Sequence, residues 1–78
     1  MLTLYSTWGC HLCEEAEALL HAAGISFTVV DIVDDPAAFA LYRTEIPVLT
    51  YQHDLGISEL KWPFDAASLH RFMTQQVL

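Results

Sequence analysis

Cys10 and Cys13 are the residues of this chain whose type and spacing indicate chemistry. Two cysteines separated by two residues can close into a disulfide and open again, which suits thiol–disulfide exchange. The preceding residues 2–6 alternate and favour a strand, whereas the residues that follow, to about residue 23, have helical spacing. The C-x-x-C pair therefore lies where a strand passes into the first turn of a helix, which is the context of a redox motif.

The amino end of that helix favours a negative charge on the first cysteine. Unpaired backbone N–H groups and the positive end of the helix dipole stabilise a thiolate there. The dipole contributes only about 0.3–1 kcal/mol, which is less than about one pKa unit, so hydrogen bonds to sulfur and neighbouring charges must supply more. Protonated His11 would add positive charge, whereas Glu14 and Glu15 oppose it. We expect a lowered but not extreme pKa for Cys10.

The spacing also predicts different roles for the two sulfur atoms. Cys10, at the loop–helix junction, is expected to be the more exposed, to attack a disulfide and to form a mixed disulfide. Cys13, one turn into the helix, then resolves that intermediate by closing the Cys10–Cys13 bond. A structural disulfide is the alternative, but so short a loop gives only about 2 kcal/mol of chain-entropy stabilisation. The pattern therefore favours redox or metal use.

Composition argues against several classes of function. The 78 residues are 54% hydrophobic, which predicts a single domain, residues 1–78, with a compact core. The formal net charge is −7 and only three residues are Lys or Arg, so neither nucleic acid nor an anionic membrane surface is an expected partner. No segment approaches about 20 apolar residues and none resembles a secretory signal. Two cysteines in an unexported protein fit a reducing cytoplasm, where we expect this protein to act. We also expect a monomer.

Seven elements are expected to position the cysteines. Apolar residues at helical spacing predict the buried face of the first helix, formed by Leu12, Ala16, Leu19, Leu20 and Ala23. The second strand is apolar on both faces, which is typical of a strand covered on both sides. The last two strands form an antiparallel hairpin, and the first two are parallel through a right-handed crossover. The predicted fold class is α/β, with the order βαβαββα and a four-stranded mixed sheet flanked by three helices. The strands are expected at 2–6, 25–33, 46–51 and 55–61. The helices are expected at 11–23, from 36 to about 43, and after Asp65.

This order, with C-x-x-C before the first helix and a proline opening the third strand, resembles the thioredoxin superfold. Three stretches, CHLCEEA at 10–16, IPVL at 46–49 and WPFD at 62–65, resemble the small bacterial glutaredoxin-like proteins. The resemblance implies reduction of protein disulfides or glutathione mixed disulfides by a dithiol, with glutathione as a possible co-substrate and no tightly bound cofactor. It also implies that the Ile46–Pro47 bond is cis and lies beside Cys10, which would leave the Ile46 backbone free to pair with a substrate strand.

This chain departs from ordinary glutaredoxins at two places, and the second, at residues 60–64, concerns the binding of glutathione. Those proteins carry C-P-Y-C, whereas this chain has C-H-L-C, and their Gly-Gly pair before the last helix is replaced here by LKWPF at 60–64. Asp65 would still occupy the position that meets the amine of the ligand, although a plain N-cap is favoured. Arg43 and Lys61 are the candidates to meet glutathione carboxylates, and Arg43 equally suits the carboxyl end of a helix.

Three questions about the site stay open at this point. Trp8 is either a lid beside the sulfur or a packed aromatic side chain. A metal or iron–sulfur module would use Cys10, Cys13 and His11 as soft ligands, although no second C-x-x-C completes a closed site. A catalytically inactive interaction module would bind a protein partner through a surface around Trp8 and Trp62.

Overall fold

A four-stranded mixed sheet and three α-helices make up the computed structural model, which describes residues 2–77, the last two by their backbone alone. This confirms the predicted order of elements. In chain order the elements are β1 (Leu2–Ser6), α1 (His11–Ala22), β2 (Thr28–Asp31), the short 3-10 helix η1 (Ile32–Asp34), α2 (Pro36–Tyr42), β3 (Val48–His53), β4 (Gly56–Lys61) and α3 (Ala66–Val77).

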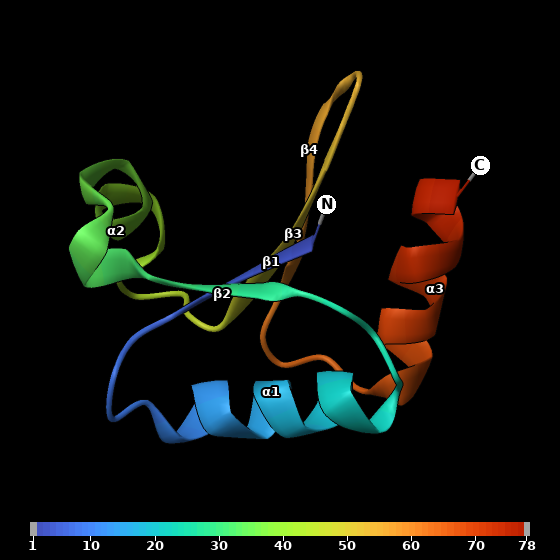
Figure 1. Cartoon of the computed structure of the whole chain (residues 1–78), viewed down its shortest axis with the longest axis horizontal. Helices are drawn as coiled ribbons and strands as arrows, with labels where there is room; N and C mark the ends of the chain where they lie inside the picture. The colour runs from blue at the N-terminus through green and yellow to red at the C-terminus, as the bar shows by residue number, and fades with distance from the viewer. Residues whose placement is uncertain (1, 78) are drawn as a thin grey trace.

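The strand order β2-β1-β3-β4 decides which loops meet at one end of the sheet. β1 is parallel to β2, where Ser6 pairs with Asp31, and antiparallel to β3, where Tyr5 pairs with Val48. The carboxyl ends of β1 and β2 and the amino end of β3 therefore lie together. Figure 1 shows the loop after β1 leaving this end of the sheet and leading into α1.

The core lies on both faces of the sheet. Leu4 and Leu49, which face each other across β1 and β3, are fully buried against Ala16 and Leu20 of α1 and Leu69 of α3. A smaller cluster on the opposite face packs α2 and η1 against the sheet and consists of Ile32, Ala38, Tyr42 and Val48. Figure 1 shows the corresponding layers, with α1 on one side of the strands and α2 on the other. The sheet is thus held rigidly beneath the loop that carries the cysteines.

β2 is shorter and more exposed than the sequence predicted. The strand begins at Thr28 and ends at Asp31, after which Ile32 turns inward as the first residue of η1. It lies at the edge of the sheet, and Val29 is 45% exposed. The prediction of a strand covered on both faces is wrong. Its β-branched residues indicate that the segment forms a strand, but they do not indicate whether the strand lies at the edge or in the middle of the sheet.

The buried face of α1 is rotated from the predicted one. Leu12 is 45% exposed and Ala23 lies beyond the helix on the surface, so neither belongs to the core stripe. Cys13, Ala16 and Leu20 are instead the buried residues of this helix. The second cysteine therefore forms part of the hydrophobic face with which α1 packs on the sheet.

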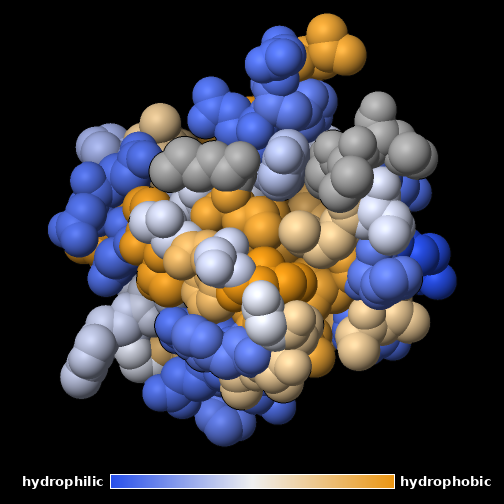
Figure 2. All heavy atoms as spheres, turned by 45° about the vertical axis from the view of Figure 1, so that its right-hand side comes forward, coloured by the Kyte–Doolittle hydropathy of each residue, from blue (hydrophilic) through white to orange (hydrophobic). Residues whose placement is uncertain are grey.

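The surface carries apolar as well as charged side chains. Figure 2 shows one face on which hydrophobic side chains gather at the centre and hydrophilic side chains surround them. Single exposed apolar side chains elsewhere, such as Leu55 in the β3–β4 turn, are ordinary on folded domains. Among the helices of residues 2–77, none has the length and apolar character needed to cross a lipid bilayer.

Candidate functional site

Cys10 is the N-cap residue of α1. Its backbone is extended, its carbonyl accepts the Glu14 N–H at 3.2 Å, and its Sγ accepts the Cys13 N–H at 3.1 Å. Gly9 precedes it with φ of +78°, a left-handed conformation that glycine adopts without steric cost. The turn into the helix thus holds the Cys10 sulfur where the backbone N–H groups and the helix dipole favour negative charge.

The two cysteines form a disulfide, with their Cα atoms 5.2 Å apart. Cys13 is 1% exposed and faces the core, whereas Cys10 is partly exposed. The predicted difference in exposure is confirmed. Cys10 is therefore the more accessible of the two cysteines to a partner molecule.

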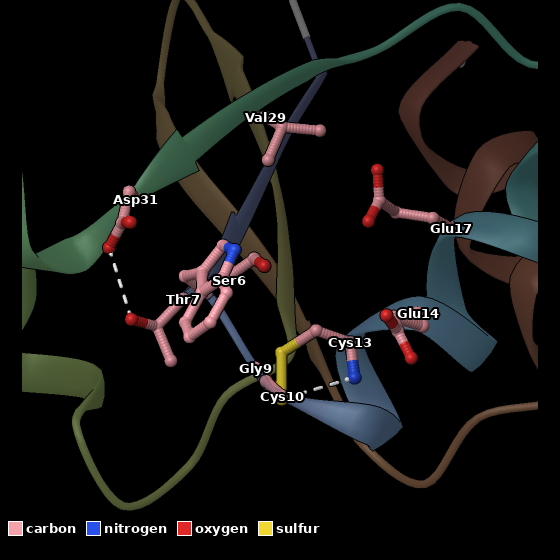
Figure 3. A pocket seen from close by; sticks show the side chains of 10 residues that line it. Ser6, Thr7, Gly9, Cys10, Cys13, Glu14, Glu17, Val29 and Asp31 are labelled. Carbon is pink, nitrogen blue, oxygen red and sulfur yellow. Dashed lines mark hydrogen bonds between the residues drawn. A yellow bond between two sulfur atoms is a disulfide. The ribbon is translucent and has the colours of Figure 1, made fainter.

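A pocket of about 390 Å³ opens beside the disulfide, between the β1–α1 loop, the first turns of α1 and β2. Three of its lining side chains are acidic, namely Glu14 and Glu17 from α1 and Asp31 from the end of β2. Figure 3 shows the disulfide at the base of this space, with Glu17 and Asp31 on different sides of it. The described lining residues include no lysine or arginine.

Asp31 attaches the cysteine loop to the sheet. Its Oδ1 accepts the Thr7 hydroxyl at 3.1 Å, the bond drawn in Figure 3, and also accepts the Val33 N–H at 3.0 Å as the N-cap of η1. Because Thr7 lies three residues before Cys10, this side-chain bond restricts the position of the loop relative to β2. The carboxylate is thereby fixed at the rim of the pocket.

Two predicted site residues, Trp8 and His11, lie at the surface. Trp8 is 93% exposed and lines the pocket, so the alternative of a packed aromatic side chain is wrong. His11 is also exposed, and its Nδ1 lies 3.8 Å from the Glu14 carboxylate. Among the residues that the structure describes, the close charged partner of His11 is therefore this carboxylate.

Ile46 and Pro47 lie at the same end of the sheet as the cysteine loop, because Pro47 directly precedes Val48, the partner of Tyr5. The Ile46–Pro47 peptide bond is cis, and Pro47 is fully buried. The Ile46 N–H donates to the carbonyl of Tyr42 at 3.0 Å. The expectation of a free Ile46 backbone is thus wrong for its N–H, which is already bonded within the chain. Neither residue lines the pocket beside the disulfide.

The three residues expected to meet glutathione also lie outside this pocket. The Lys61 ammonium lies 2.8 Å from Glu45, and this hydrogen bond raises the pKa of Lys61. Asp65 is the N-cap of α3, where it accepts the Ser68 N–H at 2.8 Å while Ser68 Oγ accepts the Asp65 N–H at 2.9 Å. The hydrogen bond from the Ser68 backbone N–H to the carboxylate, and after it the interaction with the Ser68 side chain, lower the pKa of Asp65. Arg43 is the exposed C-cap of α2. Contact of the three with glutathione stays a prediction.

Sequence reasoning missed Glu17 and Asp31 as pocket residues. The signal for Glu17 was its position four residues after Cys13, which places both on one face of α1. Asp31 reaches the site only through the pairing of β2 with β1, and that pairing joins residues far apart in sequence. No pattern of neighbouring residues in the sequence could therefore predict that Asp31 lies in this pocket.

The alternative functions have less support in the structure. Within residues 2–77, no three His, Cys, Asp or Glu side chains are grouped to hold a metal ion. Trp62 is partly buried and packs edge-on against Phe64, with ring centroids 5.0 Å apart. The expected Trp8/Trp62 surface is therefore reduced mainly to Trp8.

Comparisons with known proteins bear on the fold and the family. Residues 1–74 match the family model described as a glutaredoxin-like domain (DUF836). The X-ray structure of target protein XcR50 from X. campestris is similar, with 39% identity, coverage of 96% of this chain and 97% of that chain, and a TM-score of 0.80. The solution structure of the same target is also similar, with 40% identity, coverage of 95% of this chain and 92% of that chain, and a TM-score of 0.77. The structure of thioredoxin 1 from Thermosipho africanus shares the fold, with a TM-score of 0.66. It is 11% identical in sequence, and the match covers 97% of this chain and 92% of that chain. No curated protein matches the chain.

Proposed function

The chain belongs to the glutaredoxin-like domain (DUF836) family and has a small thioredoxin-like fold, and on that basis we propose that it is a dithiol–disulfide oxidoreductase. One observation carries the proposal. The Cys10–Cys13 disulfide lies at the amino end of α1, with the N-cap cysteine partly exposed and the second cysteine buried. This is the arrangement that thiol–disulfide exchange requires, because one sulfur must be accessible and the other must be within bonding distance of it.

The reaction begins from the reduced protein. The Cys10 thiolate attacks one sulfur of a substrate disulfide, forms a Cys10–substrate mixed disulfide and releases the other substrate sulfur as a thiolate, which takes up a proton. Cys13 then loses its proton and attacks the Cys10 sulfur. The second substrate thiol leaves, and the Cys10–Cys13 disulfide of the structure is restored. Two electrons have passed from the dithiol to the substrate.

The substrates we propose are disulfide-containing proteins or glutathione mixed disulfides. No tightly bound cofactor is required in this proposal, since the two sulfur atoms hold both electrons themselves. A thiol reductant, either glutathione or a dithiol protein, must return two electrons in each cycle. A reducing cytoplasm supplies such thiols and is the compartment that we propose for the protein, acting as a monomer.

Trapping the mixed disulfide tests the proposal. The Cys10→Ser and Cys13→Ser variants are each reduced, freed of reductant and mixed with a peptide disulfide, and the products are analysed by mass spectrometry after acid quenching. We expect Cys13→Ser to accumulate one peptide adduct at Cys10, because no resolving sulfur remains, and Cys10→Ser to form adduct far more slowly.

Circular dichroism of both variants provides the folding control for this experiment. Equal adduct formation by the two folded variants would contradict the assigned order of attack. Failure of reduced wild-type protein to form the internal disulfide at the expense of any peptide disulfide would contradict the oxidoreductase function itself.

A further inference from the structure

The pocket beside the disulfide has acidic side chains on two sides. Glu14 and Glu17 come from α1, and Asp31 comes from the end of β2. Of the three Lys and Arg residues in the chain, none lines this pocket, and Lys61 is already paired with Glu45. The ionisable carboxylates that line this pocket are therefore not balanced by any lysine or arginine among its described lining residues.

Glu17 is the carboxylate best placed to meet a cation. It is partly buried, and it has no hydrogen-bond or ion-pair partner among the residues that the structure describes. Figure 3 shows its carboxylate extending from α1 into the space beside Val29. A charge at a partly enclosed site is screened less by water and salt than one on an open surface, so its attraction for a cation is stronger.

Trp8 supplies a second, independent feature that suits a cation. Its indole is 93% exposed and lines the same pocket as the acidic side chains. The face of a tryptophan ring attracts ammonium and guanidinium groups within about 6 Å. An aromatic face combined with carboxylates is the environment that favours a lysine or arginine side chain over a neutral or acidic one.

We infer that this pocket selects substrates that carry a lysine or arginine beside the reactive disulfide, and that it disfavours glutathione. The inference rests on the proposed oxidoreductase function and names the substrate class of the same site. A basic side chain next to the attacked sulfur approaches Glu17 and Trp8, whereas glutathione, with two carboxylates and one ammonium group, brings net negative charge to an acidic pocket. The expected partner is therefore a basic segment of a disulfide-containing protein.

The test uses single turnovers of wild-type protein that has been reduced with dithiothreitol and then desalted, so that no physiological reductant is needed. Two peptide disulfides are compared that differ only in having Lys or Glu next to the cysteine, with glutathione disulfide as a third substrate. We expect the Lys peptide to react several-fold faster than the Glu peptide at low salt. The ratio is expected to fall in 0.5 M salt, because screening shortens the range of the attraction.

Matched variants identify the source of the selectivity. Glu17→Gln is expected to lower the Lys/Glu rate ratio about two- to fivefold, the range of a single partly screened ion pair. Glu15→Gln removes the same charge from the same helix, but Glu15 is exposed and does not line the pocket, so this variant is expected to keep the wild-type ratio. Glu17→Lys is expected to reverse the preference.

Several results would overturn the inference. Equal rates for the Lys and Glu peptides would do so while leaving the oxidoreductase function intact, because both peptides would still be reduced. Equal effects of Glu15→Gln and Glu17→Gln would show that only net charge matters. If none of the disulfides is reduced by folded protein, the proposed function fails and the inference fails with it.

Discussion

Substitution of Cys10 separates its role as a helix cap from its role as a nucleophile. The Sγ atom accepts the Cys13 N–H at 3.1 Å and so satisfies one of the free donors of α1. Cys10→Ser keeps an acceptor at this position, whereas Cys10→Ala removes it, and loss of an N-cap acceptor costs about 1 kcal/mol. Both variants are expected to lose disulfide reduction, but only the alanine variant is expected to lose stability.

The size of the chain converts this energy into a measurable shift. With about 2.1 cal/mol/K of unfolding entropy per residue, 78 residues give about 0.16 kcal/mol/K, so a loss of 1 kcal/mol lowers Tm by about 6 °C. Thermal unfolding followed by circular dichroism, with reductant present for all three proteins, excludes any contribution from the disulfide. We expect Cys10→Ser to match reduced wild type and Cys10→Ala to melt about 6 °C lower. Equal Tm values for the two variants would refute the capping argument.

Two further predictions concern α3 and the second core cluster. Asp65→Ala removes the acceptor of the Ser68 N–H and is expected to lower the midpoint of urea unfolding. Asp54→Ala in the exposed β3–β4 turn is expected to have little effect, and equal losses of stability in the two variants would contradict the capping role of Asp65. Burial, followed by the hydrogen bond to Glu59, raises the pKa of Tyr42 above its ordinary value of about 10. Since the folded state favours the neutral phenol, Tyr42 stabilises the folded state fully below pH 10, and this stabilisation is lost as the pH rises above 10. The free energy of unfolding is therefore expected to fall less between pH 8 and 11 in Tyr42→Phe than in wild type. An equal fall in the two proteins would contradict this role of Tyr42.

The features that the sequence predicted well depend on neighbouring residues. The helix α2 begins at residue 36, where it was predicted to begin. Asp35 caps it because an Asp side chain reaches the N–H groups two and three residues ahead, and Pro36 suits its first position. Cys10 is the N-cap of α1 for the same local reason. The antiparallel pairing of β3 with β4 was also predictable, since only a short turn separates the two strands.

The features that the sequence did not predict depend on contacts between distant residues. The edge position of β2 and the resulting exposure of Val29 follow from the choice of β1 as an inner strand. The place of Asp31 in the pocket follows from its pairing with Ser6. The Ile46 N–H donates a hydrogen bond to the Tyr42 carbonyl, and this bond depends on how α2 ends. Propensity and periodicity carry no information on such pairings.

Titration of the Cys10 thiol tests most directly whether the amino end of α1 activates this sulfur. The Cys13→Ser variant leaves a single thiol, and its ionisation is followed by ultraviolet absorbance of the thiolate. Because the residue 13 N–H and the helix dipole favour the thiolate, we expect a pKa below the value of about 8.5 of an ordinary cysteine. A pKa of 8.5 or above in the folded variant would contradict activation of this sulfur by the amino end of α1.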